Sequence, residues 1–194
     1  MSDPLPVEEL FRTPTRRKLI ETFVTADPET VFRKEELHEQ GIASYAKINE
    51  NVGTTENPGP LVMMGVIGFT NPDGPMSRLC VPDTPVMNLL REVDRAEIGN
   101  LFETPATQKL TRYFLLHAGA EQSYTYTQIQ DATGVSQSAI RNNVPTIIET
   151  GLVSQVYTNG RKEHTVHRDS EMYQTLNELN EAIYEAYTAD AQSA

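Results

Sequence analysis

The sequence has one cysteine, no tryptophan and no long apolar segment. Because Cys80 is alone, the chain can form neither an internal disulfide nor a metal site of several cysteines, which favours an intracellular, cytoplasmic protein. No run of residues approaches the ~18 apolar residues that cross a membrane, so we expect no membrane association. The start, Met1-Ser2-Asp3-Pro4, lacks the basic and apolar regions of a signal peptide.

Basic residues are also few. The chain has 16 lysines and arginines against 27 aspartates and glutamates, and its formal net charge is −11. This balance excludes a basic surface spread over the whole molecule, but it leaves room for a local binding face. The scarce lysine, the absent tryptophan and the many Asp, Glu and Thr residues resemble the proteins of halophilic archaea. The alternative is an ordinary acidic protein from a mesophile.

The negative charge is unevenly distributed along the chain. Residues 1–96 have a net charge of −5, residues 97–168 contain six basic and six acidic side chains, and residues 169–194 contain six acids and no base. A neutral region within an acidic chain is where we expect contact with a polyanion.

Three motifs occur twice, in the same order and with similar spacing. Residues 10–14 (Leu-Phe-x-Thr-Pro) recur at 101–105, residues 44–54 match 136–146, and residues 65–67 match 151–153. The repeat predicts two domains of one fold, 1–96 and 97–194. Two copies are too few for a solenoid, so each domain needs its own core.

The second copy shows clearly which elements each domain contains. Thr104-Pro105 is typical of a helix start, Thr125 and Gln128 form a capping-box pattern, and Ser136 is an N-cap for a third helix. Residues 152–157 and 163–167 read as strands, and Asn159-Gly160 predicts a tight turn between them. We therefore expect three helices followed by a β-hairpin.

Residues 129–141, with Gly134-Val135-Ser136 at the turn, and the later Gly151-Leu152-Val153 resemble the winged helix-turn-helix of MarR- and ArsR-like transcriptional regulators of prokaryotes. The resemblance covers 104–168 and, through the repeat, 13–81. It implies an α+β, mostly α fold, with two winged-helix domains in tandem, each of three helices, a β-hairpin wing and a following helix. It also implies a transcriptional regulator that binds double-stranded DNA.

Pro145 departs from this pattern. Proline lacks an N–H group and clashes with the preceding helical turn, and the matching residue of the first copy is Gly53. We therefore predict a short recognition helix over residues 137–143, then a kink and a further turn through Thr150.

The candidate DNA-binding residues of the second copy lie on the third helix and at the hairpin tip. With Ile140 and Val144 facing the core, the outward residues able to contact base edges or phosphates are Gln137, Ser138, Arg141, Asn142, Asn159, Arg161 and Lys162. The alternative is an ordinary solvated polar surface.

The first copy is a weaker candidate for DNA binding, since an acidic residue, Glu50, lies among its outward positions. Its possible contacts are Arg16, Arg17, Lys18, Tyr45, Lys47 and Asn49. A role in dimerisation or sensing is the alternative for this domain.

A helix is expected after each hairpin, from Thr84-Pro85 in the first copy and from Asp169 in the second. The C-terminal helix has an apolar stripe that we expect to pair with its mate in a homodimer, formed by Met172, Leu176, Leu179, Ile183 and Tyr187. The alternative is that this stripe packs on its own domain.

The sequence gives little support for an enzymatic function. There is no glycine-rich phosphate loop and no metalloprotease motif, and we expect neither cofactor nor metal. His164 and His167 are three residues apart on a strand, so they point to opposite faces and cannot chelate together. A second class of function is a protein-binding scaffold, because tandem winged helices also occur in acidic chromosome-segregation subunits. The net charge favours the scaffold, and the neutral region favours DNA binding.

Overall fold

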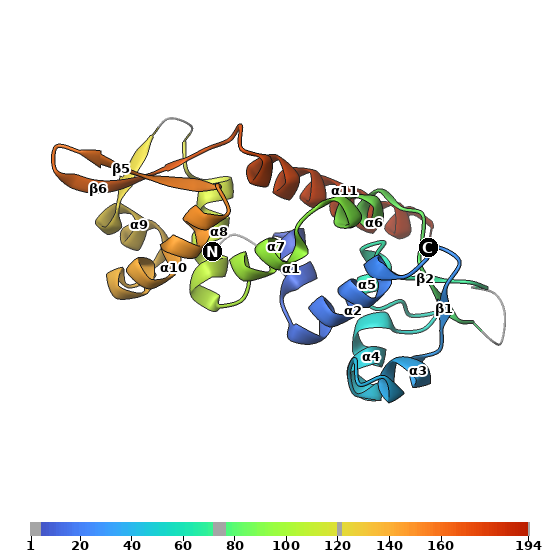
Figure 1. Ribbon diagram of the computed structural model, residues 1–194. Coiled ribbons are helices and arrows are strands. Elements are labelled where there is room, and N and C mark those ends of the chain that lie inside the picture. Colours follow the sequence, from blue (N-terminus) through green and yellow to red (C-terminus); the bar gives the residue numbers. More distant parts are fainter. Residues whose placement is uncertain (1–4, 72–76, 120–121, 194) are drawn as a thin grey trace. The chain divides into compact units, whose positions relative to one another are not determined.

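The computed structural model describes residues 5–71, 77–119 and 122–193 (Figure 1). The expected α+β, mostly helical class is confirmed, with two small three-stranded sheets. The chain forms two compact units. We call residues 9–95 and 178–194 the first unit, and residues 1–8 and 96–177 the second unit. Over the described residues, no helix is both long and apolar enough to cross a membrane.

The first unit contains short helices and a small antiparallel sheet with the strand order β1-β3-β2. Its elements in chain order are α2 (Pro14–Thr25), β1 (Val31–Phe32), α3 (Lys34–Glu39), α4 (Tyr45–Val52), α5 (Pro60–Met63), β2 (Gly68–Phe69), β3 (Leu79–Cys80) and α6 (Pro85–Glu92). Its core includes the fully buried Leu19, Phe23, Ile48 and Leu61.

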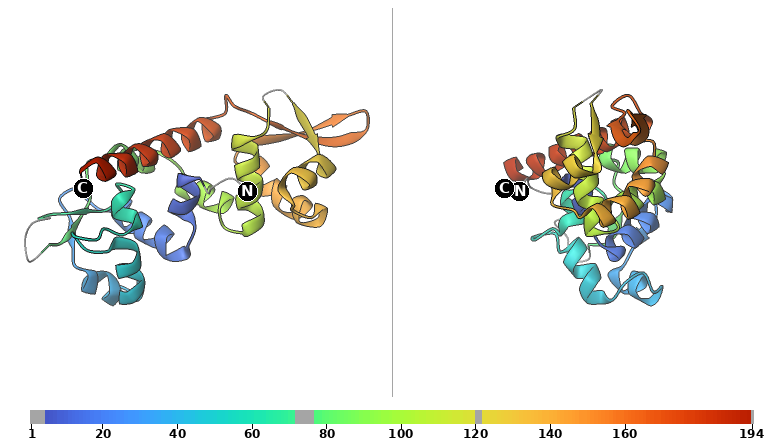
Figure 2. Two further views of the ribbon diagram at one scale, coloured as in Figure 1. Left: turned by 180° about the vertical axis from the view of Figure 1, so that it is seen from behind. Right: turned by 90° about the vertical axis from the view of Figure 1, so that its left-hand side faces the viewer.

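The second unit has a similar order of elements without a helix equivalent to α5, and its antiparallel sheet has the equivalent strand order β4-β6-β5. Its elements are α7 (Arg95–Leu101, which begins with the last residue of the first unit), α8 (Pro105–Leu116), β4 (Ser123–Thr125), α9 (Tyr126–Thr133), α10 (Gln137–Glu149), β5 (Val153–Thr158) and β6 (Arg161–Val166). Within this unit the β5–β6 hairpin extends away from the helices (Figures 1 and 2).

The repeated Leu-Phe-x-Thr-Pro motif builds the same start of a helix in both units. Thr13 and Thr104 are extended N-cap residues whose hydroxyls accept the backbone N–H of Arg16 and Thr107, and a proline follows each of them. The Leu-Phe pair before each cap is buried. The motif therefore both begins the helix and anchors it in the core.

A second repeated residue, the asparagine at 51 and 143, joins the third helix to the first. Asn143 Nδ2 donates to Ala139 O at 2.7 Å, and Thr104 Oγ1 donates to Asn143 Oδ1 at 3.3 Å. Asn51 Nδ2 likewise donates to Lys47 O at 2.8 Å. Both amides thus keep hydrogen-bond partners on their own helix while reaching the neighbouring one, which satisfies polar atoms that are largely buried.

The prediction that the recognition helix covers only residues 137–143 is wrong, whereas the matching helix of the first unit is short. Helix α4 ends at Val52, because Gly53 adopts a φ of +69°. Helix α10 continues through Pro145 to Glu149. A proline costs a helix one hydrogen bond and some strain. Burial of Ile140, Val144 and Ile147 on the same helix holds it together across that position.

Several smaller expectations also need correction. Strand β4 was not expected, because Ser123–Thr125 are too few residues to show an alternating pattern, yet they pair with β6. The spacing of Ile129 and Ala132 predicts that both face inward on α9, but Ala132 is exposed and Val135 is buried instead. The helical spacing of Leu110, Tyr113, Phe114 and His117 predicts one face of α8, but His117 lies just beyond the end of this helix and is exposed.

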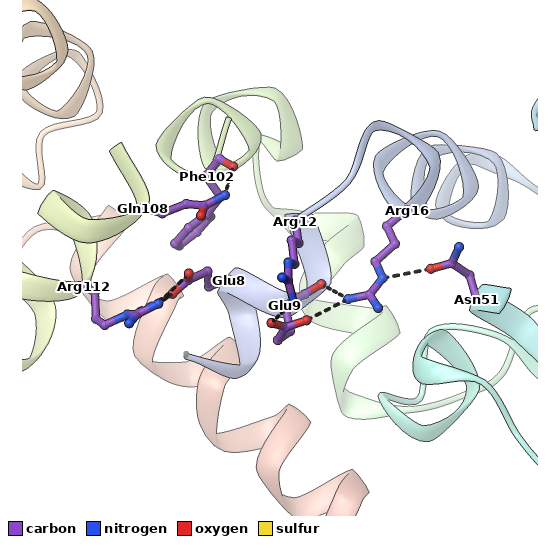
Figure 3. Close-up of polar contacts among 8 residues, drawn as sticks. All are labelled: Glu8, Glu9, Arg12, Arg16, Asn51, Phe102, Gln108 and Arg112. Carbon is purple, nitrogen blue, oxygen red and sulfur yellow. Dashed lines mark hydrogen bonds and ion pairs between the residues drawn. The ribbon is translucent and has the colours of Figure 1, made fainter. Parts of the chain in front are cut away.

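Two helices, α1 (Pro6–Phe11) and α11 (Glu171–Ser193), contribute residues to both units. In the second unit, Glu8 is 6% exposed, and Arg112 Nε donates to its Oε2 at 3.0 Å while Nη2 donates to Oε1 at 2.6 Å (Figure 3). A two-point contact of this kind is the strongest arrangement of this ion pair. The N-terminal residues are thereby fixed to the second unit.

The expected dimer stripe of α11 is already covered. Met172, Leu176, Leu179 and Ile183 are buried within the single chain, and Tyr187 is half-buried. Their assignment to a homodimer contact is therefore corrected to packing within the chain, because burial in the core removes the same apolar surface from water.

We expect Gly53→Ala to destabilise the chain by about 2–4 kcal/mol, because a Cβ at this positive φ would collide with the backbone of Asn57 and Pro58. Gly41→Ala is the matched control: Gly41 has a φ of +73°, but nothing lies within 4 Å of its added Cβ. Urea unfolding of both variants measures the difference. If both variants lose the same free energy of unfolding, the 54–59 loop does not pack tightly against Gly53.

Candidate functional site

The main surface feature of the second unit is an open groove of about 940 Å³ between α9, α10 and the β5–β6 hairpin. Its lining residues are Thr125, Tyr126, Thr127, Gln128, Gln137, Arg141, Pro145, Gln155, Arg161 and Lys162. Three of them are cations, and none of the described residues that line the groove is acidic. In a chain of net charge −11, this groove is a local surface that favours an anion.

The helical wall of the groove is set by its N-caps. Thr125 and Gln128 form the expected capping box at the start of α9. Gly134 then ends this helix in the left-handed conformation, with a φ of +69°. The Ser136 hydroxyl accepts the Ala139 N–H and begins α10. These three local signals bring the first turns of α9 and α10 together.

Packing of α10 decides which of its side chains line the groove. Ile140, Val144 and Ile147 face the core and are at most 1% exposed. Gln137 and Arg141 lie on the other side of the helix and line the groove. Gln137 Nε2 donates to Thr127 Oγ1 at 3.3 Å, a contact between the two exposed helix starts.

Arg141 is further held by an aromatic neighbour. Its guanidinium carbon lies 5.7 Å from the centre of the Tyr126 ring, which is cation–π range. The Tyr126 ring in turn lies 4.9 Å from the His164 ring. The N–H groups of a guanidinium lie at the edge of its plane. An aromatic ring on one face therefore leaves them free to donate to an anion or to a base edge.

The other wall of the groove is the β-hairpin. Thr158 pairs with Arg161 across a two-residue turn in which Asn159 and Gly160 both have positive φ, 51° and 76°. The expected Asn-Gly turn is confirmed. It leaves Arg161 and Lys162 exposed at the tip, with Lys162 Nζ 6.0 Å from the centre of the Tyr157 ring.

The groove therefore brings together four of the seven residues that the sequence singled out in this unit: Gln137, Arg141, Arg161 and Lys162. Ser138, Asn142 and Asn159 are exposed but do not line it. Sequence reasoning missed Tyr126, Thr127 and Gln155. The capping box located the start of α9, and the side chains of its first turn could have been added from that signal.

Three of the residues proposed in the first copy have partners within the protein. Arg16 is engaged inside the first unit: it contacts Glu9, and its Nε donates to Asn51 Oδ1 at 2.8 Å (Figure 3). This side chain is only 13% exposed. The arginine is therefore a structural contact, and its assignment to DNA is corrected.

Two further members of that set have internal partners. Lys47 Nζ lies 2.6 Å from Glu50 Oε2, and Asn49 Oδ1 accepts from Lys34 Nζ at 2.8 Å. Arg17 is half-buried, Lys18 is exposed, and Tyr45 is 41% exposed.

His164 is the one fully buried ionisable ring next to the groove among the described residues. Its Nδ1 lies 3.4 Å from Tyr124 O, while its Nε2 makes no hydrogen bond with the residues that the structure describes. Burial lowers the pKa of His164, and the Lys162 charge acts in the same direction, against the contact with Tyr124 O. The surroundings of the ring therefore favour its neutral form.

The first unit has an apolar residue at the same place. His164 pairs with Tyr124, the residue before the N-cap of α9, and Leu79 pairs with Phe32, the residue before the N-cap of α3. Leu79 is also buried, at 1% exposure. An apolar side chain is thus compatible with this position of the sheet.

Comparison of the chain with protein-family models, with curated proteins and with solved structures gives no match. The function proposed below is therefore argued from the geometry and charge of the groove.

We expect His164→Leu to remove a pH-dependent part of the stability. Because the folded state lowers the pKa of this ring, the unfolded chain takes up protons first, and stability is lost as pH falls below about 6.5. The leucine variant lacks this loss and keeps or slightly raises the stability at pH 8. Urea unfolding across this pH range, with the exposed His117→Leu as control, measures the effect. An unchanged acid-side loss in His164→Leu would contradict it.

Proposed function

We propose that the second unit is a winged-helix domain that binds double-stranded DNA through its groove, and that the chain is a transcriptional regulator with two such domains in tandem. The single observation that supports this most is the acid-free groove in an acidic chain. Arginine, lysine, glutamine and threonine are the side chains that contact phosphates and base edges.

The two walls of the groove suit different contacts. Helix α10 presents Gln137 and Arg141, which can form paired hydrogen bonds with adenine and guanine. The hairpin presents Arg161 and Lys162, which suit phosphates and position the protein without selecting sequence. Ser138, Asn142 and Asn159 are exposed beside these residues and are available to flanking contacts.

The order of elements supports the tandem arrangement. Each unit has a helix, a strand, two further helices (followed by the short α5 in the first unit) and two strands, with the third strand in the centre of the sheet. The proposal includes a cytoplasmic location, where the chromosome of a prokaryote is directly accessible. It includes no dimer through the apolar stripe of α11, because that stripe is covered.

A protein-binding scaffold is the second candidate, and the net charge of −11 is the observation that favours it. The two candidates make opposite predictions for the groove. A scaffold for a protein partner has no need of a cationic groove for duplex DNA, so loss of its cations leaves any residual DNA affinity unchanged.

The helix side of the groove is tested with Arg141→Ala in the full-length chain. We expect about 1–3 kcal/mol of lost affinity for the best-bound duplex from a pool of random sequence, and a smaller loss for unrelated duplexes, because a base contact is removed. Fluorescence anisotropy measures both. Lys109→Ala is the control, since Lys109 is exposed on α8, outside the groove.

The hairpin side is tested with Arg161→Ala/Lys162→Ala. Here we expect weaker binding to all duplexes alike, and a salt dependence of log K that is shallower by about 2, one for each lost phosphate contact. Wild-type affinity and salt dependence in this variant and in Arg141→Ala would refute the groove as the DNA-binding surface.

A further inference from the structure

The first unit has a groove at the same place in its fold. This groove, of about 580 Å³, lies where the start of α3, the start of α4 and the strand β3 meet. Arg33 is the N-cap of α3 and Tyr45 is the first residue of α4, as Thr125 and Gln137 are for α9 and α10. The two grooves are therefore built from equivalent elements, although their side chains differ.

The lining of this groove includes two arginines, each next to a paired residue of β1 or β3. Strands β1 and β3 are antiparallel and pair Phe32 with Leu79, so the next positions in register are Arg33 and Arg78. Both line the groove. In the second unit the corresponding pair is Thr125 and Glu163. Like charges opposite each other on neighbouring strands repel, and a bound anion would relieve that repulsion.

The neighbouring charges do not cancel the two arginines. Glu35 lines the groove, and Glu36 Oε1 lies 3.9 Å from Arg33 Nε, but this pair is largely solvent-exposed and therefore weak. Lys34 also lines the groove, with its ammonium turned to Asn49 Oδ1 and Gly53 O. It fixes α3 to the end of α4 and leaves the arginines as the outward cations.

A hydroxyl group beside the arginines supplies a second, independent observation. The Oγ atom of Ser77 is buried and has no hydrogen-bond partner among the described residues, and Ser77 lines the same groove. Arg78 is anchored by its backbone, because its carbonyl accepts from Thr70 N at 2.9 Å. A serine hydroxyl and two guanidiniums in one groove are donors of the kinds that hold a phosphate oxygen.

We propose that this groove of the first unit is a second contact with double-stranded DNA, in which Arg33, Arg78 and Ser77 hold a backbone phosphate. The identity of the ligand rests on the proposed function, whereas the preference for an oxyanion follows from the groove itself. Tyr45 lines this groove at the position that Gln137 has in the groove of the second unit. The contact with the phosphate therefore adds affinity without selecting a base.

The test follows each groove separately in the full-length chain. Arginine side-chain and backbone NMR signals are recorded while a short duplex of random sequence is added, and again with a poly-glutamate peptide of similar net charge. Binding of the duplex is also measured for Arg33→Ala/Arg78→Ala. Arg91→Ala serves as control, because Arg91 is an exposed arginine on α6 of the same unit, outside the groove.

We expect the duplex to shift the signals of Arg33 and Arg78 as well as those of Arg141 and Arg161. We also expect the double variant to bind every duplex several-fold more weakly, while Arg91→Ala matches the wild type. Shifts confined to Arg141 and Arg161, with wild-type affinity in the double variant, would overturn this inference and leave the proposed function standing.

Shifts confined to the first unit would overturn the proposed function and support a phosphate-binding groove here. If the peptide moves Arg33 and Arg78 and the duplex does not, the groove binds an acidic protein, and the proposal of a DNA contact is wrong. No shift in either unit would overturn both proposals.

Discussion

The packing of α10 on its neighbours is the constraint on which the second unit depends. Ile140, Val144 and Ile147 bury one side of the helix, and α10 contacts α8, α9 and β5. Asn143 adds a polar tie to Thr104 at the start of α8. With one side fixed in this way, Gln137 and Arg141 on the opposite side line the groove. The same packing keeps α10 helical on both sides of Pro145.

The fixed helix explains how an acidic chain keeps a cationic surface. Charges on exposed loops of mixed sign are screened over about a nanometre in salt, so a usable positive region needs its cations close together and its acids excluded. In the second unit this is achieved by two rigid elements, the first turn of α10 and a tight hairpin. None of the acidic residues that the structure describes is part of the lining of that groove.

Much of this fold could be predicted because it depends on interactions between residues close in sequence. The threonine and serine caps, such as Thr125 and Ser136, and the Asn159-Gly160 turn act through hydrogen bonds and φ angles of neighbouring residues, so the sequence shows them directly. Features set by distant residues were missed or misjudged. Strand β4 forms because it pairs with β6, which is distant in sequence. Arg16 is largely removed from solvent and donates to Asn51, which is 35 residues away.

Because α1 and α11 are shared, neither unit is continuous in sequence. The second unit needs Glu8 for its ion pair with Arg112, and the first unit includes α11 from Glu178 onward, with Leu179 and Ile183 buried. During synthesis the first unit therefore cannot complete its core until the last helix leaves the ribosome. A fragment cut between residues 95 and 96 would leave each half incomplete, so truncation at the apparent midpoint is a poor route to isolated domains.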